Sequence, residues 1–317
     1  MEEIIGESQI IRKLINLTDR TAAHDSTVLI IGETGTGKEL FARRIHRMSR
    51  RAKRQFLAIS CAAIPATLLE SEMFGYAKGA FTGADNNKPG LFEEADSGTL
   101  FLDEISEMDI ERQSKLLRVL EYGEVRRLGS NETGKVDVRI IAASNRNLWQ
   151  EVEKGRFRAD LFFRLSVVNL YIPPLREREE DIPVLIRHFL KIFNAEHHKK
   201  VTRISDEAIN ILRDYDYPGN IRELRNIIQH AVIFSENDAI TRKDLPVYLA
   251  EKQGLLTIGS GQAENLAQDS GQTISGMEKN LIRQTLSRFN GNQSKTAKSL
   301  GISRSTLWRK IKQYKLD

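Results

Sequence analysis

The chain has 317 residues, of which 40% are hydrophobic and 29% charged, a composition that fits a water-soluble protein with one large domain and one or two small ones. Its apolar strings are too short to span a bilayer, and its N-terminus, Met1-Glu2-Glu3, lacks the basic and apolar regions of a secretory signal, so we expect no membrane contact. A single cysteine, Cys61, excludes an internal disulfide and fits the reducing cytoplasm. The net charge of +5 is unevenly distributed, because residues Arg283 to Asp317 contain nine Lys/Arg and one acidic residue.

Residues 1–175 alternate short β-branched runs with stretches of helical spacing. This alternation predicts βα units, and therefore an α/β domain with a parallel sheet and flanking helices. The predicted strands are Thr27–Ile31, Phe56–Ser60, Thr99–Leu102, Val138–Ala143 and Val167–Leu170. Pro173-Pro174 ends the pattern.

The rest of the chain is predicted to form two helical parts joined by a linker. Residues 176–250 form the first part, an all-helical subdomain with predicted helices at Ile182–Glu196, Asp206–Asp214 and Ile221–Phe234. Asn220, at the end of a Pro-Gly turn, is placed to cap the third of these helices. Residues 251–276 are rich in Gly and Ser, which predicts a flexible linker, and helical spacing returns in residues 277–317.

A glycine-rich loop follows the first predicted strand and precedes a helical pattern. It reads Gly32-Glu33-Thr34-Gly35-Thr36-Gly37-Lys38. Glycines let a backbone turn tightly and direct N–H groups at phosphate oxygens, a helix N-terminus adds partial positive charge, and a lysine reaches the β and γ phosphates. The loop therefore predicts a nucleotide site. Glu39 stands where a Ser or Thr hydroxyl usually binds Mg²⁺ in such loops.

Three further groups are candidates for the chemistry of this site. Asp103 and Glu104 end a predicted apolar strand, where Asp103 would hold Mg²⁺, directly or through water, and Glu104 would polarise the attacking water. Asn145, after another strand, is placed either to sense the γ-phosphate or to make an ordinary turn. Arg158 and Arg164 fit surface ion pairs, or guanidinium groups that enter the site of a neighbouring subunit.

One loop resembles a segment that is specific to a single family. Gly79-Ala80-Phe81-Thr82-Gly83-Ala84 is similar to the GAFTGA loop of the bacterial enhancer-binding proteins that activate sigma-54 RNA polymerase, which are AAA+ ATPases. The resemblance covers the chain nearly end to end, through the segments GETGTGKE, ESEMFG, GTLFLDEI, FRADLFFRL, PPLRERE and YPGNIREL. It implies an AAA+ P-loop domain with an all-helical lid. The family usually carries an N-terminal regulatory domain, so we expect either a naturally short activator or a fragment.

The resemblance assigns roles to individual residues. Glu39 is the residue that the family usually has after the phosphate-loop lysine. Asn145 looks like the family's first sensor residue, which would sense the γ-phosphate. Arg158 and Arg164 match arginines that act in trans, with Arg164 the stronger candidate, and Arg222 matches the second sensor in the lid. Phe81 and Thr82 match the loop tip that touches sigma-54, which agrees with the physics, because an exposed aromatic side chain between glycines is a poor core element.

One position departs from the family. Relatives usually have Asn before the cysteine of an NCAA segment, and this Asn holds the catalytic Glu away from water until the polymerase is engaged. Here the segment reads Ser60-Cys61-Ala62-Ala63. Because Ser is shorter and has no amide, we expect its hydrogen bond to Glu104 to be weaker or bridged by water. Cys61 itself is expected to be a small buried hydrophobic residue rather than a nucleophile.

The C-terminal residues show helix-turn-helix spacing. Leu281, Ile282, Thr285, Leu286 and Phe289 share one helical face, and Ala297, Leu300, Leu307, Ile311 and Tyr314 continue the predicted core. The segment resembles the Fis-type DNA-binding domain. The residues placed to contact DNA are Ser303, Arg304, Ser305, Thr306, Trp308, Arg309 and Lys312. A single short helix-turn-helix is marginal for sequence-specific DNA binding, so we expect two copies to bind a palindromic DNA site as a dimer.

These patterns together predict an ATP-hydrolysing transcription activator. The cofactors are ATP and Mg²⁺, and the partners are the sigma-54 RNA polymerase holoenzyme, enhancer DNA and further copies of the chain, from dimer to hexameric ring. Two alternatives are a DNA-remodelling AAA+ motor, which gives no reason for GAFTGA, and a DNA-bound repressor whose ATPase domain only oligomerises, which would not need the catalytic acids. The histidines show no metal-ligand spacing, so we expect no transition metal.

Overall fold

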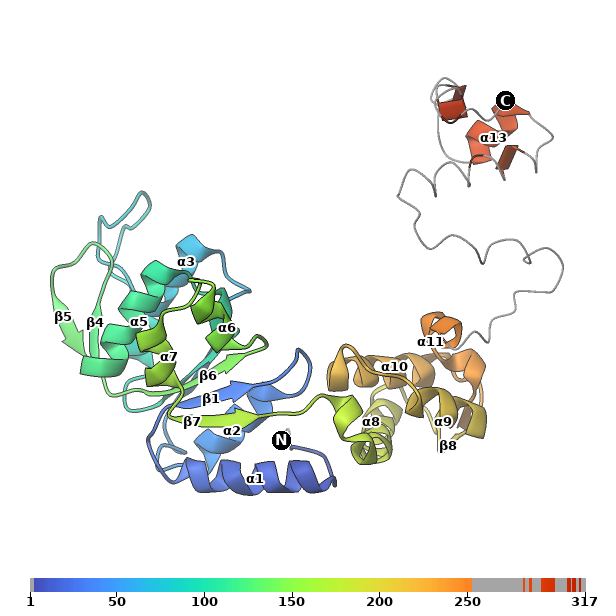
Figure 1. Cartoon of the computed structure of the whole chain (residues 1–317), viewed down its shortest axis with the longest axis horizontal. Coiled ribbons are helices and arrows are strands. Elements are labelled where there is room, and N and C mark those ends of the chain that lie inside the picture. Colours follow the sequence, from blue (N-terminus) through green and yellow to red (C-terminus); the bar gives the residue numbers. More distant parts are fainter. Residues whose placement is uncertain are drawn as a thin grey trace. The chain divides into compact units, whose positions relative to one another are not determined.

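A computed structural model of the chain divides into two compact units, Met1–Leu256 and Thr257–Asp317 (Figure 1). The structure describes residues 3–252 and, in the second unit, residues 282, 285, 286, 292–299, 307, 308, 310, 311 and 314. Among these residues, no helix is long and apolar enough to cross a membrane.

A five-stranded parallel sheet organises the first part of the larger unit. Its strands are β1 (Val28–Ile31), β2 (Phe56–Ser60), β3 (Thr99–Asp103), β6 (Arg139–Ser144) and β7 (Val168–Tyr171), in the spatial order β2-β3-β6-β1-β7. All five predicted strands are confirmed, with ends that differ by one residue at most. Because the strands are parallel, their carboxyl ends lie at one edge, where Ser60 is paired with Asp103 and Ile31 with Ser144.

Helices cover both faces of this sheet, as the βα alternation predicts. One face packs on α1 (Gln9–Ala22) and α2 (Lys38–Arg47). The other face packs on a layer made by α3 (Ala66–Phe74), α4 (Leu91–Glu94), α5 (Ile110–Tyr122), α6 (Leu148–Glu153) and α7 (Ala159–Leu165). Alternate strand residues point to the two faces, so Leu102 enters the second layer and Phe101 the first.

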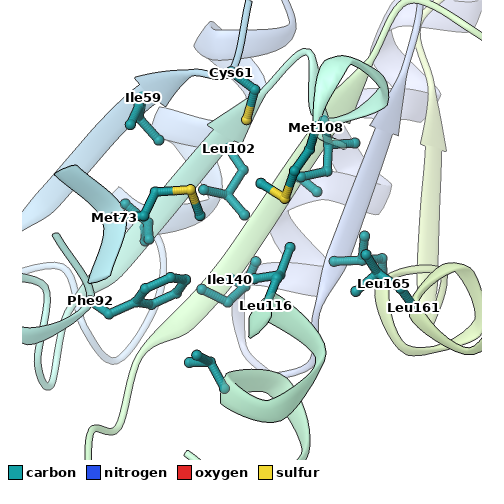
Figure 2. Close-up of a cluster of buried hydrophobic side chains, with 14 of the residues drawn as sticks. Ile59, Cys61, Met73, Phe92, Leu102, Met108, Leu116, Ile140, Leu161 and Leu165 are labelled. Atoms are coloured by element: carbon teal, nitrogen blue, oxygen red, sulfur yellow. The ribbon is translucent and has the colours of Figure 1, made fainter. Parts of the chain in front are cut away.

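The second layer contains the only cysteine of the chain. Figure 2 shows Cys61 among apolar side chains that include Leu102 and Met108. Cys61 is 4% exposed, and this burial raises the pKa of its thiol to about 12. The thiol is therefore protonated at neutral pH and packs as a hydrophobic group, as expected from the sequence.

The lid follows the sheet in the same compact unit. Its helices are η2 (Leu175–Glu177), η3 (Glu179–Asp181), α8 (Ile182–Glu196), α9 (Asp206–Arg213), α10 (Asn220–Phe234), η4 (Arg242–Asp244) and α11 (Val247–Lys252). The buried apolar residues of η2, α8, α9, α10 and α11 share one cluster. The three predicted lid helices are confirmed. The prediction of helices only was wrong in one detail, because β8 (Arg203–Ile204) and β9 (Ala239–Ile240) form a short parallel pair.

The predicted capping role of Asn220 was also wrong. Helix α10 begins at Asn220 itself, Gly219 occupies the N-cap position, and no side chain caps the helix there. Asn220 has a left-handed backbone, with φ of +52°, and its side chain is fully buried. Its amide makes hydrogen bonds to segments that are distant in the sequence, which a reading of local turn residues does not reveal.

The smaller unit has its own apolar cluster. Ile282, Ala297, Leu307 and Ile311 are buried together, with Leu286 and Tyr314 packed against them. These residues are among those predicted to face inward, whereas Leu281, Phe289 and Leu300 lie outside the described residues. Helix α13 (Gln293–Ser299) follows Asn292, whose side chain accepts a hydrogen bond from the backbone N–H of Lys295 at 3.2 Å.

Candidate active site

The glycine-rich loop connects β1 to α2, at the edge where the parallel strands end. Gly35 and Gly37 have left-handed backbones, with φ of +80° and +99°, which other residues rarely adopt. Lys38 is the first residue of α2 and is 7% exposed. Its Nζ donates hydrogen bonds to the carbonyl oxygens of Gly32 and Glu33 at 2.8 and 3.1 Å. The side chain thus folds back over the loop, where a phosphate group would lie.

Two carboxylates face this lysine from the end of β3. Asp103 is half-buried, and burial raises the pKa of its carboxyl group although the charge of Lys38 opposes the shift. Burial also lowers the pKa of Lys38, while Asp103 and Glu104 oppose that change. Glu104, the next residue, has a left-handed backbone, with φ of +53°. Both carboxylates are within electrostatic reach of Lys38, so the structure brings the predicted catalytic groups together.

Ser60 lies beside this pair, at the end of the neighbouring strand. Its Oγ donates a hydrogen bond directly to Oε2 of Glu104 at 3.0 Å. A water bridge is therefore not needed. The pairing of Ser60 with Asp103 between β2 and β3 brings the two backbones close enough for the short hydroxyl to reach the carboxylate.

Two further predicted residues lie at the same loop. Nδ2 of Asn145 donates to Oγ1 of Thr34 at 3.3 Å, because β6, which precedes Asn145, is next to β1 in the sheet. Arg222, in the first turn of α10, lines the same cavity as Lys38 and Asp103. This cavity has a volume of about 610 Å³ and is also lined by Gly35, Thr36, Gly37 and Glu39.

The apolar part of this cavity was not foreseen from the sequence. It is lined by Ile4, Ile5, Leu185, Phe189, Ile192 and Ile221, and His188 also lines the cavity. The residues from α8 recur at helical spacing and look like ordinary core residues, yet Ile192 is 40% exposed. That exposure depends on the fold and cannot be read from helical spacing alone. Such a lining suits the flat face of a nucleobase.

The two candidate trans arginines lie elsewhere. Arg158 forms a bidentate pair with Asp160, at 3.0 and 2.7 Å. Arg164 is exposed and donates to the carbonyl oxygen of Leu120 at 3.1 and 2.9 Å. Within the described residues, neither arginine lines the cavity that contains Lys38. The structure therefore does not bring them to the phosphate loop of their own chain.

The segment Gly79–Ala84 forms a loop outside this cavity, with an exposed tip and a buried last residue, Ala84. Gly79 and Gly83 have left-handed backbones, and a Cβ atom at either position would meet no described atom within 4 Å. The ring of Phe81 is 47% exposed and contacts Tyr76 edge-on, at 5.0 Å between centroids. The N–H of Gly79 donates to the carbonyl oxygen of Ala84 at 2.9 Å, which closes the loop. Ala80 and Thr82 lie on the same turn.

A short hairpin supports the base of this loop. Strands β4 (Glu124–Arg126) and β5 (Thr133–Lys135) form the hairpin, and the residues after β4 lie against the loop. The N–H of Ala77 donates to the carbonyl oxygen of Leu128 at 2.9 Å, and Leu128 donates back to Gly75 at 3.0 Å. The loop tip is therefore exposed on a fixed base.

Of the predicted DNA-contacting residues, only Trp308 lies among the described residues, and it is 51% exposed. This exposure agrees with a side chain on the outer face of its helix, because Leu307 is buried next to it. The others, Ser303, Arg304, Ser305, Thr306, Arg309 and Lys312, lie outside the described residues.

Comparison with known proteins assigns each part of the chain to a family model. The sigma-54 interaction domain matches residues 4–171, the AAA+ ATPase lid domain residues 176–256, and the bacterial regulatory protein Fis family residues 273–314. The chain is 45% identical to the regulatory protein AtoC of Escherichia coli K12, over 99% of this chain and 68% of AtoC. It is 43% identical to the phenol regulator MopR of Acinetobacter guillouiae, over 100% of this chain and 57% of MopR.

A solved structure is also similar. The crystal structure of NtrX from Brucella abortus in complex with ATP matches with a TM-score of 0.75 and 34% identity, over 99% of this chain and 69% of that one. The matched relatives and the structure are all longer than this chain. The fold, the assembled phosphate site and these matches lead to one conclusion: the chain belongs to the family of sigma-54-dependent transcription regulators, which are AAA+ ATPases with a Fis-type helix-turn-helix domain.

Proposed function

We propose that this chain hydrolyses ATP in a ring of identical subunits and uses the Gly79–Ala84 loop to remodel the closed complex of sigma-54 RNA polymerase. One observation carries the proposal: the same α/β frame gathers the phosphate loop, Lys38 and Asp103 around one cavity and, outside it, presents an exposed loop with a half-exposed aromatic tip. Phe81 contributes to no apolar cluster among the described residues. An exposed aromatic group between glycines suits contact with a protein partner.

The residues present fit ATP with Mg²⁺. The N–H groups of the phosphate loop, the N-terminus of α2 and Lys38 would hold the phosphates. Asp103 would hold Mg²⁺, which in phosphate sites usually takes one or two carboxylates together with phosphate oxygens. The raised pKa of Asp103 supports this, because a carboxylate that is destabilised by burial gains from a nearby cation. Bound Mg²⁺ would neutralise charge on the phosphates during transfer.

Hydrolysis requires a carboxylate that is free to polarise water. We assign this role to Glu104, which in the present structure is held by the hydroxyl of Ser60. Breaking this hydrogen bond would release Glu104 toward the γ-phosphate. Asn145, at the phosphate loop, would detect whether that phosphate is present.

A neighbouring subunit would complete the site. Arg164 and Arg158 lie away from the cavity of their own chain, and an arginine supplied by a neighbouring subunit can stabilise charge on the transferring phosphoryl group. A head-to-tail interface would bring Arg164 of one subunit to Lys38 of the next, and such interfaces close into rings. We propose a hexamer. Paired helix-turn-helix domains would hold the ring on a palindromic enhancer.

A connected path leads from the site to the loop. Ser60 ends β2, and the chain then passes through α3 to Gly75 and the loop beyond it. A change in the contact between Ser60 and Glu104 would thus act on the start of this segment, and it would displace the loop at the end of the segment. Control of a loop by γ-phosphate contacts is a common switching device.

Transcription in vitro tests this function. The full chain, ATP and a supercoiled template with an upstream binding site would be combined with either sigma-54 or sigma-70-type polymerase. We expect ATP-dependent open complexes, detected by permanganate footprinting, with the sigma-54 enzyme only. Opening with both enzymes, or with neither while ATP is hydrolysed, would contradict the proposal and favour another AAA+ remodelling activity.

A further inference from the structure

The lid begins directly on the outer side of the phosphate loop. The backbone N–H groups of Ile221 and Arg222 donate to the carbonyl oxygen of Gly35 at 3.0 and 3.3 Å. The approach is so close that a Cβ atom at Gly35 would lie 2.2 Å from the carbonyl oxygen of Gly219. The first turn of α10 therefore uses the loop backbone as its acceptor, in place of a side-chain cap.

Asn220 joins this contact to two further segments through its buried amide. Its Oδ1 accepts a hydrogen bond from the N–H of Leu175 at 2.8 Å, just after the end of the sheet. Its Nδ2 donates to the carbonyl oxygen of Thr34 at 3.0 Å and to Oε2 of Glu33 at 3.1 Å. A buried amide that is satisfied on both sides fixes the segments it joins, because any displacement would leave a polar group without a partner.

Glu33 is held as an acceptor by a second residue of the lid connection. Arg176 forms a bidentate pair with it, at 2.9 and 2.6 Å, and this hydrogen bonding lowers the pKa of the Glu33 carboxyl group. Glu33 is therefore ionised at neutral pH and accepts from Asn220. The outer side of the phosphate loop is bound at residues 33, 34 and 35, while its inner side faces the cavity.

We propose that Asn220 is a positioning residue for ATP hydrolysis: its amide locks the first turn of α10 onto the phosphate loop and so directs Arg222 into the cavity. Asn220 is not among the residues that line the cavity, whereas Arg222, two residues later, lines it together with Lys38. Asn220 therefore acts through Arg222, and the inference rests on the proposed sensor role of that arginine. Because the contact is reciprocal, a change in the phosphate loop would also move α10.

Two substitutions at Asn220 test this role. Asn220→Asp keeps the shape and an acceptor for Leu175, but it replaces the donor group with a carboxylate oxygen facing two acceptors. Asn220→Gly removes the amide while tolerating the left-handed backbone. We expect both variants to lower kcat for ATP by about tenfold to a hundredfold, with a smaller change in KM, because misplacement by an ångström has effects of this size. Asn210→Asp, an equivalent change on the exposed face of α9, should leave kcat unchanged.

Two combinations separate positioning from general loss of structure. If Asn220 acts through Arg222, then Asn220→Asp/Arg222→Ala should turn over ATP no more slowly than Arg222→Ala alone. Adding Glu33→Gln to Asn220→Asp should restore part of kcat relative to Asn220→Asp alone, because an amide again provides a donor opposite the carboxylate. Thermal melting would accompany each variant.

The outcomes that overturn the inference are specific. Wild-type kcat in both single variants would remove the positioning role, as would losses that multiply in the double variant with Arg222→Ala. If Asn220→Asp does not fold, Asn220→Gly decides the question. All readouts are ATP turnover without polymerase, so failure of the proposed promoter opening would appear in the transcription assay and leave this result unaffected.

Discussion

At the scale of single residues, the hydrogen bond between Ser60 and Glu104 is the contact with the clearest consequence. The carboxylate that would polarise water is bound by a hydroxyl at 3.0 Å, rather than by the amide that the family usually places there. The expectation of a water bridge was wrong, because the strand register brings Ser60 beside the end of β3, whereas the expectation of a weaker hydrogen bond stays a prediction. A serine hydroxyl has a single donor, so its hydrogen bond to Glu104 can break without leaving an amide group unsatisfied, as would happen with asparagine.

Ser60→Ala should therefore raise ATP turnover in the absence of polymerase. A hydrogen bond to a charged group contributes about 1.5–3 kcal/mol, so we expect an increase of about tenfold to a hundredfold at saturating ATP. Ser235→Ala also removes a buried hydroxyl hydrogen bond, but in the lid and away from the cavity, and it should leave the rate unchanged. A Ser60→Ala variant with the native basal rate, and with an intact fold by circular dichroism, would show that the contact does not restrain Glu104.

At the scale of elements, the Gly79–Ala84 loop lies outside the cavity that contains Lys38 but is hydrogen-bonded to the rest of the α/β domain. At its base, the N–H of Ala77 donates to Leu128 and the N–H of Leu128 donates to Gly75, while its tip has an exposed ring and two glycines in open space. Such a loop can change position without altering the cavity. Catalysis and output should therefore be separable by mutation.

Thr82→Ala provides this separation. We expect ATP hydrolysis at close to the native rate but loss of promoter opening, because Thr82 lies in the loop and does not line the cavity. ATP turnover and permanganate-sensitive open complexes would be measured on the same preparation. Thr133→Ala, an exposed change on the neighbouring hairpin, serves as the matched control. Native promoter opening by Thr82→Ala would disprove the assignment of the output loop.

At the scale of the whole molecule, the two arginines proposed to act in trans, Arg158 and Arg164, do not line the ATP cavity of their own chain. Arg164 is bound to the carbonyl oxygen of Leu120 and does not line the cavity, so hydrolysis should depend on assembly. The smaller unit, in contrast, has an apolar cluster that is separate from those of the larger one. Two properties of the whole chain follow, and each has a test.

Mixing two inactive variants tests the shared site. Arg164→Ala and Lys38→Ala should each abolish hydrolysis, because one removes the arginine and the other the phosphate-binding lysine. In mixed rings, an intact Arg164 can face an intact Lys38, so part of the activity should return. Native mass spectrometry would confirm that mixed oligomers form. If such oligomers are present and hydrolyse no ATP at any mixing ratio, the trans role of Arg164 is wrong.

Removing the residues after about Gly276 tests the independence of the smaller unit. We expect loss of site-specific DNA binding with ATP turnover retained, because the ATP cavity is built from residues 3–225 only. At high concentration the truncated chain should still open promoters, since DNA mainly raises its local concentration. Footprinting and ATPase assays measure the two properties, and a truncated chain that protects the enhancer as well as the full chain does would end the DNA-binding assignment.

The sequence alone determined the features that depend on short-range pattern. β-branched runs located the five strands, because a strand covered on both faces is apolar along its length, and helical spacing located the three lid helices, because one buried face recurs with each turn. The phosphate loop and the acidic pair were recognisable because their chemistry needs adjacent residues. The inward-facing residues of the smaller unit, including Ile282 and Leu307, followed from the same periodicity.

Tertiary structure alone decided which distant groups meet. The direct contact of Ser60 with Glu104 depends on the register between β2 and β3, which no local pattern specifies. The apolar residues of α8 looked like core until the fold placed them around a cavity. Asn220 looked like a helix cap, yet its amide is bound by Thr34 and Leu175, more than forty residues away. Long-range contacts of this kind depend on how the chain closes its loops, and sequence periodicity carries no information about that closure.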